Sequence, residues 1–60
     1  MTNLVAQAIK DARTARGWSK AKLARQLGIS AAAVSQWESG ATFPNLARLI
    51  EASGVLDIDL

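Results

Sequence analysis

The chain of 60 residues contains no cysteine and no histidine. It can therefore form no disulfide, and it lacks the thiolates and imidazoles that ligate zinc or act as nucleophile and general base near neutral pH. Its five acidic residues are scattered, and no glycine-rich phosphate loop follows a strand. Because these absences exclude most enzyme classes, we expect no catalytic residue, no metal, no cofactor and no small-molecule substrate.

Long apolar runs are absent as well. No segment approaches the roughly 18 apolar residues of a membrane span. The N-terminal sequence MTNLVAQAIKDAR breaks its apolar stretch early with Gln and Lys, unlike a signal peptide. We therefore expect no membrane contact and a cytoplasmic location. The length predicts a single domain over residues 1–60 with one small core.

The two halves of the chain differ in charge. Residues 1–30 hold six basic side chains and one acidic side chain, whereas residues 31–60 hold one basic and four acidic side chains. The net charge of +2 therefore hides a balance of +5 in the first half and −3 in the second. We expect a polyanion to meet the basic end of the molecule.

Residues 20–39, KAKLARQLGISAAAVSQWES, are typical of two short helices joined by a tight turn. Ser19 and Ser30 are suitable N-caps, and Gly28 is suited to end the first helix. An apolar pair flanks each cap in the hydrophobic staple pattern, which fixes how the chain enters a helix. The expected buried positions are Leu23, Ala24 and Leu27 in the first helix and Ala33, Val34 and Trp37 in the second.

Two further helices are predicted. The first runs over about residues 3–16, with Val5, Ile9 and Ala12 as its inner stripe, and ends at Gly17. After a loop at residues 40–44, a helix capped by Asn45 carries apolar residues at roughly helical spacing, and Gly54 favours fraying of its end. These apolar residues are Leu46, Leu49, Ile50 and Leu56.

The pattern resembles the helix-turn-helix of phage repressors and Cro-like regulators. The resemblance rests on the apolar, Ala, Gly and anchor positions of residues 23–37, and on Arg13, Gly17-Trp18-Ser19, Glu38-Ser39-Gly40 and Pro44. It implies an all-α, lambda-repressor-like bundle of four short helices, in which the second and third form the helix-turn-helix. We expect the fifth helix usual in this family to be missing or truncated here, because only Leu60 follows Asp59, the residue at the position where that helix would be capped.

The resemblance implies sequence-specific binding of double-stranded DNA by a transcriptional regulator, with residues 30–39 in the major groove. Burial of the apolar positions would turn the remaining side chains outward, and Gln36 alone among them can pair bidentately with adenine. The candidate base-reading residues are Ser30, Ala31, Ala32, Ser35 and Gln36. The competing interpretation is that these alanines and serines merely fill a solvated helix.

Positive charge in the first turn of a helix opposes its dipole, so Lys20 and Lys22 indicate a phosphate contact there. Lys20 also matches a phosphate-contacting position of the family, and the family lays the loop after the recognition helix along the DNA backbone. The candidate phosphate contacts are Arg16, Lys20, Lys22, Ser39, Gly40 and Thr42. The alternative is that the lysines only add solubility.

Glu38 is expected beside Trp37 on the core side, where a carboxylate is costly without a partner. In proteins with this pattern the matching Arg and Glu form a salt bridge, which implies a structural pair of Arg13 and Glu38. The alternative role of Arg13 is a phosphate ligand. Trp18 and Trp37 fall on inward-facing positions, which favours core packing over base stacking.

A different class of function is a protein-interaction module, such as the helix-turn-helix part of an antitoxin-like protein. An exposed apolar patch around Leu56, Ile58 and Leu60 would favour a partner or self-association. These residues are few, so we expect a monomer in free solution and at most a weak homodimer on DNA through this C-terminal segment.

Overall fold

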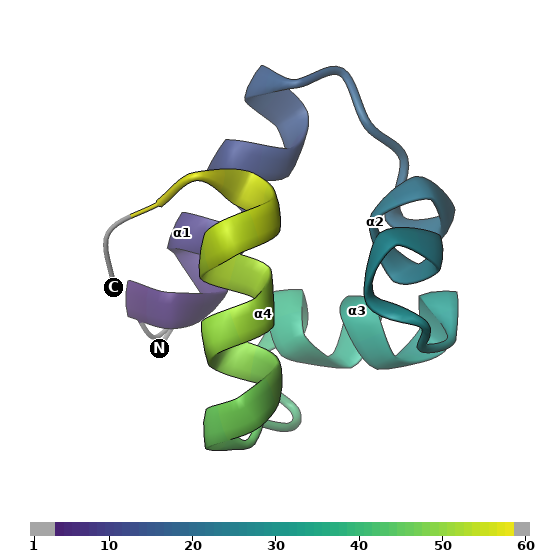
Figure 1. Cartoon of the computed structure of the whole chain (residues 1–60). Coiled ribbons are helices and arrows are strands. Elements are labelled where there is room, and N and C mark those ends of the chain that lie inside the picture. Colours follow the sequence, from purple (N-terminus) through teal and green to yellow (C-terminus); the bar gives the residue numbers. More distant parts are fainter. Residues whose placement is uncertain (1–3, 59–60) are drawn as a thin grey trace.

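The computed structural model describes residues 4–58, which form four helices and no strand. The helices are α1 (Leu4–Ala15), α2 (Lys20–Leu27), α3 (Ala31–Ser39) and α4 (Leu46–Leu56). As Figure 1 shows, α4 stands beside α1, α2 lies on the other side of the molecule, and α3 runs along the bottom between them. None of the helices in this part of the chain is long and apolar enough to cross a membrane.

The cap residues set the helix boundaries. The side chains of Ser19, Ser30 and Asn45 accept hydrogen bonds from the backbone N–H three residues later, at 3.0, 3.1 and 2.9 Å. Gly28 ends α2 in the left-handed conformation, with φ of 68°. These side-chain bonds satisfy donors that the first turn of a helix leaves free, as the sequence predicted for all three caps.

The core lies where α1, α2, α3 and α4 meet. Its buried apolar side chains are Ile9, Leu23, Ala24, Leu27, Val34, Trp37, Ala52 and Leu56. Trp18 and Ile29, the residues before the two caps, are partly buried and pack against this cluster. The two staples therefore join the turn region to the core, which fixes α3 relative to α2.

Helix α1 differs in detail from the prediction. It ends at Ala15, one residue early, and Asn3 lies outside the described residues. Ile9 is buried as expected, but the other buried residues of α1 are Ala6 and Arg13. Val5 and Ala12 of the expected stripe are partly buried and pack against the core, and the guanidinium of Arg13 also reaches inward, to Glu38.

Helix α4 buries only part of the expected face, with Leu56 buried and Leu49 partly buried. Leu56 is fully buried together with Ala52, whereas Leu46 is 72% exposed and Ile50 is 62% exposed. The helix passes through Gly54 and ends at Leu56, and Asp57 takes the left-handed C-cap conformation. A small residue at the contact lets α4 approach the core closely, so Ala52 takes the place that the larger residues were expected to fill.

This orientation corrects the expected C-terminal patch. Leu56 is in the core, Ile58 is partly buried against it, and Leu60 lies outside the described residues. The described C-terminal segment therefore exposes less apolar surface than was expected for the homodimer contact, with Ile58 only partly accessible. The exposed large apolar side chains are Leu4, Phe43, Leu46 and Ile50.

Candidate nucleic-acid interface

Helix α3 is held on the core by one face and leaves the opposite face free. Val34 and Trp37 are buried, while Ala31, Ala32 and Gln36 are exposed. The i, i+3 spacing of the two anchors defines the buried stripe, and the exposed residues lie on the remaining arc of the helix.

Two serines of this region combine structural and surface positions. Ser30 Oγ accepts the hydrogen bond of the Ala33 N–H, so the cap uses an oxygen lone pair and leaves the hydroxyl hydrogen for a further partner. Ser35 is half-buried, and its Oγ lies 3.4 Å from the ammonium of Lys20. Since the ammonium donates this bond, the contact places a positive charge of α2 directly beside the exposed face of α3.

The Lys20–Ser35 contact belongs to a shallow hollow of about 220 Å³. The hollow is lined by Lys10 of α1, Lys20 of α2, and Ser35, Glu38 and Ser39 of α3. Two lysines from different helices therefore flank one concave surface. A phosphate oxygen is an acceptor that ammonium and hydroxyl groups can share, which makes this hollow suited to one phosphate of a nucleic acid.

Lys10 is the residue of this surface that the sequence did not single out. It lies on the outer side of a helix predicted for packing, and its proximity to Lys20 depends on how α1 crosses α2 and α3. The only sequence signal is its contribution to the basic first half of the chain.

The loop after α3 is tightly closed. Gly40 adopts the left-handed conformation with φ of 83°, and its N–H bonds the last carbonyls of α3. The Ser39 hydroxyl donates to the Gln36 carbonyl at 3.1 Å and accepts from the Ala41 N–H at 3.3 Å. Thr42 is exposed. Ser39 thus caps the end of the helix, and Gly40 and Thr42 continue the same surface.

Arg13 and Glu38 form a bidentate ion pair beneath this surface. Arg13 Nε donates to Glu38 Oε2 at 2.7 Å and its second nitrogen donates to Oε1 at 2.9 Å, while the third donates to the Trp18 carbonyl at 2.7 Å. Their side chains are 10% and 4% exposed. The hydrogen bond to Glu38 raises the pKa of Arg13, burial opposes the rise, and the carboxylate charge adds to it. The pair therefore ties α1 to α3.

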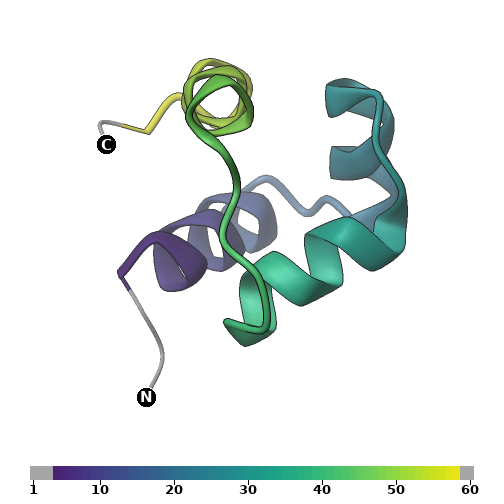
Figure 2. The same ribbon diagram turned by 90° about the horizontal axis from the view of Figure 1, so that it is seen from below.

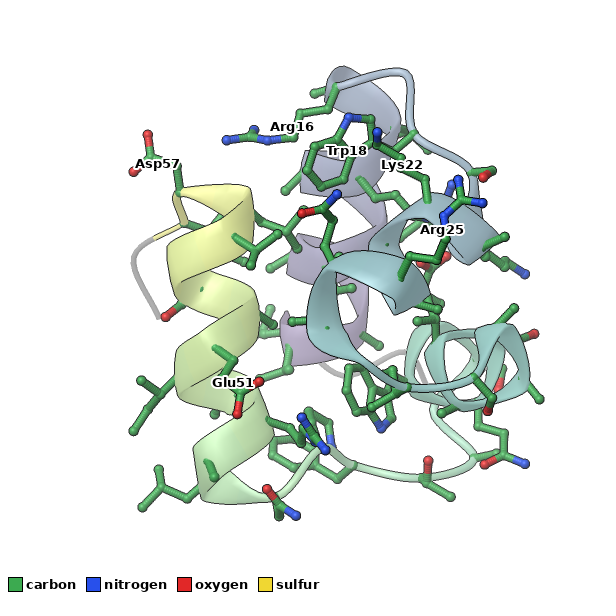
Figure 3. The ribbon with its side chains drawn as sticks, turned by 45° about the vertical axis from the view of Figure 1, so that its right-hand side comes forward. Arg16, Trp18, Lys22, Arg25, Glu51 and Asp57 are labelled. Carbon is green, nitrogen blue, oxygen red and sulfur yellow. The ribbon has the colours of Figure 1, made fainter. Side chains whose placement is uncertain are left out.

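The structure does not bring Arg16 and Lys22 to the hollow. The guanidinium carbon of Arg16 and the ammonium of Lys22 each lie 5.8 Å from the centre of the Trp18 ring. Lys22 follows Lys20 by two residues, which turns it by about 200° around α2. Figure 3 shows Arg16, Trp18, Lys22 and Arg25 together along the α1–α2 connection and α2.

No cluster of potential metal ligands occurs among residues 4–58. The geometry is that of a helix end and a short loop carrying hydroxyl, amide and ammonium groups on one surface. Such a surface can donate hydrogen bonds to phosphates and exchange hydrogen bonds with base edges.

The helix-turn-helix family matches residues 9–60. The chain belongs to the Cro/C1-type helix-turn-helix family. Among solved structures, the P22 c2 repressor in complex with a synthetic operator is similar to this helix-turn-helix protein, with 33% sequence identity and a TM-score of 0.89. The match covers 97% of this chain and 88% of the repressor chain.

A second similar structure is SinR, the master regulator for biofilm formation, in complex with DNA. It is 30% identical, covers 93% of this chain and 90% of its own, and gives a TM-score of 0.82. The N-terminal DNA-binding domain of SinR from Bacillus subtilis is 26% identical, over 93% of this chain and 83% of that domain, with a TM-score of 0.78. No curated protein sequence matches the chain significantly.

Proposed function

We propose that this helix-turn-helix protein binds duplex DNA sequence-specifically as a transcriptional regulator, with α3 in the major groove. The observation that carries the proposal is the Lys20–Ser35 contact, which sets a cation beside the exposed face of a helix anchored by Val34 and Trp37. The family membership and the DNA present in the P22 c2 and SinR structures support the same conclusion. We infer a cytoplasmic location in a prokaryotic or phage-infected cell.

The proposed base-reading residues follow the exposed arc of α3 and its cap. Gln36 pairs with the N6 and N7 atoms of an adenine, and Ser35 donates to a base-edge acceptor. Ala31 and Ala32 have no polar side-chain atoms, so they contact thymine methyl groups or allow the backbone to come close. Ser30 offers its hydroxyl hydrogen at the start of the helix. This set favours a site rich in A·T pairs.

The proposed phosphate contacts surround the hollow. Lys10 and Lys20 approach one phosphate from two sides, and the loop of Ser39, Gly40 and Thr42 continues along the backbone from the hollow, which Ser39 also lines. Phosphate contacts position the reading helix and carry no sequence information. The proposal therefore separates residues that fix the position of α3 from those that discriminate between bases.

Selection of bound sequences from a random duplex pool tests the function. We expect the bound fraction to contain a single enriched motif. A bound fraction in which no sequence is enriched would contradict sequence-specific binding. A titration of the selected duplex at several salt concentrations then counts the phosphate contacts, since each adds about 0.9 to the magnitude of the negative slope of log K against log salt.

Lys10→Ala and Lys20→Ala should each flatten that salt slope by about one unit and weaken binding alike on all sequences. Lys22→Ala is the matched control, because this lysine lies on the opposite side of α2 over Trp18. An unchanged salt slope for Lys20→Ala would show that the hollow does not contact a phosphate of the DNA. A flatter slope for Lys22→Ala would show that the sequence-based expectation for this residue holds instead.

The antitoxin-like alternative has less support. Its discriminating feature was an apolar C-terminal patch, and Leu56 is buried while Ile58 is partly buried. A chain that selects no duplex sequence but binds a protein through Phe43, Leu46 and Ile50 would favour that alternative.

A further inference from the structure

A second charged surface lies away from the proposed DNA contacts. It consists of Arg16, Trp18, Lys22 and Arg25, and we name it the Trp18 ridge. Two cations share one indole, because Arg16 and Lys22 each approach the ring centre at 5.8 Å. Arg25 follows Lys22 by three residues on the same side of α2. Figure 3 shows all four side chains on one side of the molecule.

The cations of the ridge have no acidic partner within the described part of the chain. The ion pairs among residues 4–58 join Arg13 to Glu38 and Arg48 to Glu51, and neither includes a ridge residue. A cation–π contact holds a side chain over the ring without cancelling its charge. The ridge is therefore ready to bind an anion without breaking an ion pair.

The ridge is turned away from α3. The α1–α2 connection runs along the top of Figure 1 and α3 along the bottom, and Figure 2, seen from below, places α3 in front of that connection. Lys22 of the ridge is turned by about 200° around α2 from Lys20, and no ridge residue lines the hollow beside α3. A duplex that contacts α3 and Lys20 therefore meets another side of α2 than the ridge.

The extent of the ridge favours a short ligand. Two cations lie over one indole with Arg25 nearby on α2, and Asp57 at the end of α4 lies beyond Arg16 on the same side (Figure 3). A second nucleic acid would need a row of phosphate contacts along its backbone, and the carboxylate of Asp57 would repel its continuation. A few carboxylates spaced along a peptide fit the guanidinium groups bidentately, and Trp18 offers apolar surface between them.

We propose that the Trp18 ridge is a docking surface for an acidic segment of a partner protein, bound while α3 occupies DNA. The proposal rests on the proposed function only for the assignment of α3 to DNA. Carboxylates accept hydrogen bonds from Arg16 and Arg25, and Lys22 supplies a further charge-assisted bond. The domain then binds its operator by one side and an acidic partner by the other.

A labelled oligoglutamate peptide tests the ridge directly by fluorescence anisotropy, with an oligoglutamine peptide of equal length as the uncharged control. Binding of oligoglutamate and not of oligoglutamine is expected. The double variant Arg16→Gln/Lys22→Gln should weaken it by about tenfold, the size of effect that charge-assisted hydrogen bonds give. Arg25→Gln should weaken it less but in the same direction.

Lys10→Gln/Lys20→Gln is the matched control, since it removes the same charge from the other surface. Equal losses of peptide affinity in the two double variants would show that the peptide is attracted by the overall positive charge, which would overturn the proposal. Absence of peptide binding to the parent protein would overturn it too. The melting temperature of each variant verifies that it is folded.

The selected duplex supplies the last arm of the experiment. The peptide should bind the DNA-bound protein with the affinity it has for the free protein. Displacement of the peptide by duplex, or a salt slope of duplex binding flattened by about two units in Arg16→Gln/Lys22→Gln, would make the ridge a phosphate site and overturn the proposal. Absence of any duplex binding would contradict the proposed function and leave the peptide result in free protein to decide the ridge.

Discussion

The Arg13–Glu38 ion pair is the contact between two side chains that we expect to contribute most to the stability of the packing of α1 on α3. Both side chains are almost enclosed, and all three nitrogens of the guanidinium have acceptors. A paired charge in such a position adds little beyond its desolvation cost, but loss of one partner leaves the other charge buried and alone. The pair therefore sets how α1 meets α3.

Glu38→Ala should lower the free energy of unfolding by about 3 kcal/mol, the lower end of the range for breaking a buried ion pair, because the pair lies near the surface of a small domain. Glu51→Ala is the control. Its partner Arg48 is an exposed i, i+3 neighbour, and such a pair is worth about 0 to 1 kcal/mol. Thermal melting compares them, and a Glu38→Ala variant melting within a degree or two of the parent protein would contradict the buried pair.

Individual residues differ in how far the sequence could predict their places. The cap bonds of Ser19 and Ser30 depend on local chain geometry, so the residue type and the following apolar positions suffice. The position of Lys10 depends on the crossing of three helices, and no local pattern contains that information. The same is true of Arg16 and Lys22, whose side chains turn to Trp18 and away from Lys20.

At the scale of elements, helix positions were predictable to within about a residue, whereas the face that α4 buries was not. An apolar pattern around this helix is compatible with more than one inward face, and the choice is made by tertiary contacts. Arg48 of α4 donates to the Leu27 carbonyl at the end of α2 at 3.0 Å, which ties the two helices in one orientation. That bond satisfies a carbonyl that the last turn of α2 leaves free.

Two glycines allow a paired test of the helix ends. Gly54 lies inside α4 with open space around the position of a Cβ, so Gly54→Ala should raise the free energy of unfolding by roughly 0.5 to 1 kcal/mol. Gly28→Ala also meets no atom, but φ of 68° makes an L side chain strained, and the free energy of unfolding should fall by about 1 kcal/mol.

Chemical denaturation of both glycine variants measures the difference. An unchanged stability of Gly54→Ala would show that α4 frays before Leu56, as the sequence alone suggested. An unchanged stability for Gly28→Ala would mean that the left-handed end of α2 does not constrain the turn before α3.

At the scale of the whole molecule, the charge asymmetry of the sequence has a structural counterpart. The basic half supplies α1, α2 and their connection, and apart from Arg13, which pairs with Glu38, its cations divide between the hollow of Lys10 and Lys20 and the Trp18 ridge. The sequence predicted a single basic end. Net charge in a segment does not reveal on which side of a helix each residue lies, so it could not show that the cations form two separate surfaces. The fold makes two surfaces from one charged segment.

The exposed apolar side chains of the described chain set the expectation for assembly. Leu4, Phe43, Leu46 and Ile50 are the exposed large apolar side chains, and four such side chains fall short of the roughly 800 Å² per partner of a standard interface. We expect a monomer at low micromolar concentration without DNA, and weak pairing only on adjacent half-sites. Sedimentation equilibrium measures the mass, and a dimer value at that concentration would contradict this expectation.

The central claim is that α3 reads base edges, and the affinity of Gln36→Ala for the selected duplex and for a scrambled duplex tests it most directly. Loss of a bidentate pair with adenine should cost about 1 to 3 kcal/mol on the selected duplex and little on the scrambled one. Gln26→Ala, an exposed glutamine of α2, is the control and should change neither affinity. Equal loss of affinity by Gln36→Ala on both duplexes would contradict base reading by this helix.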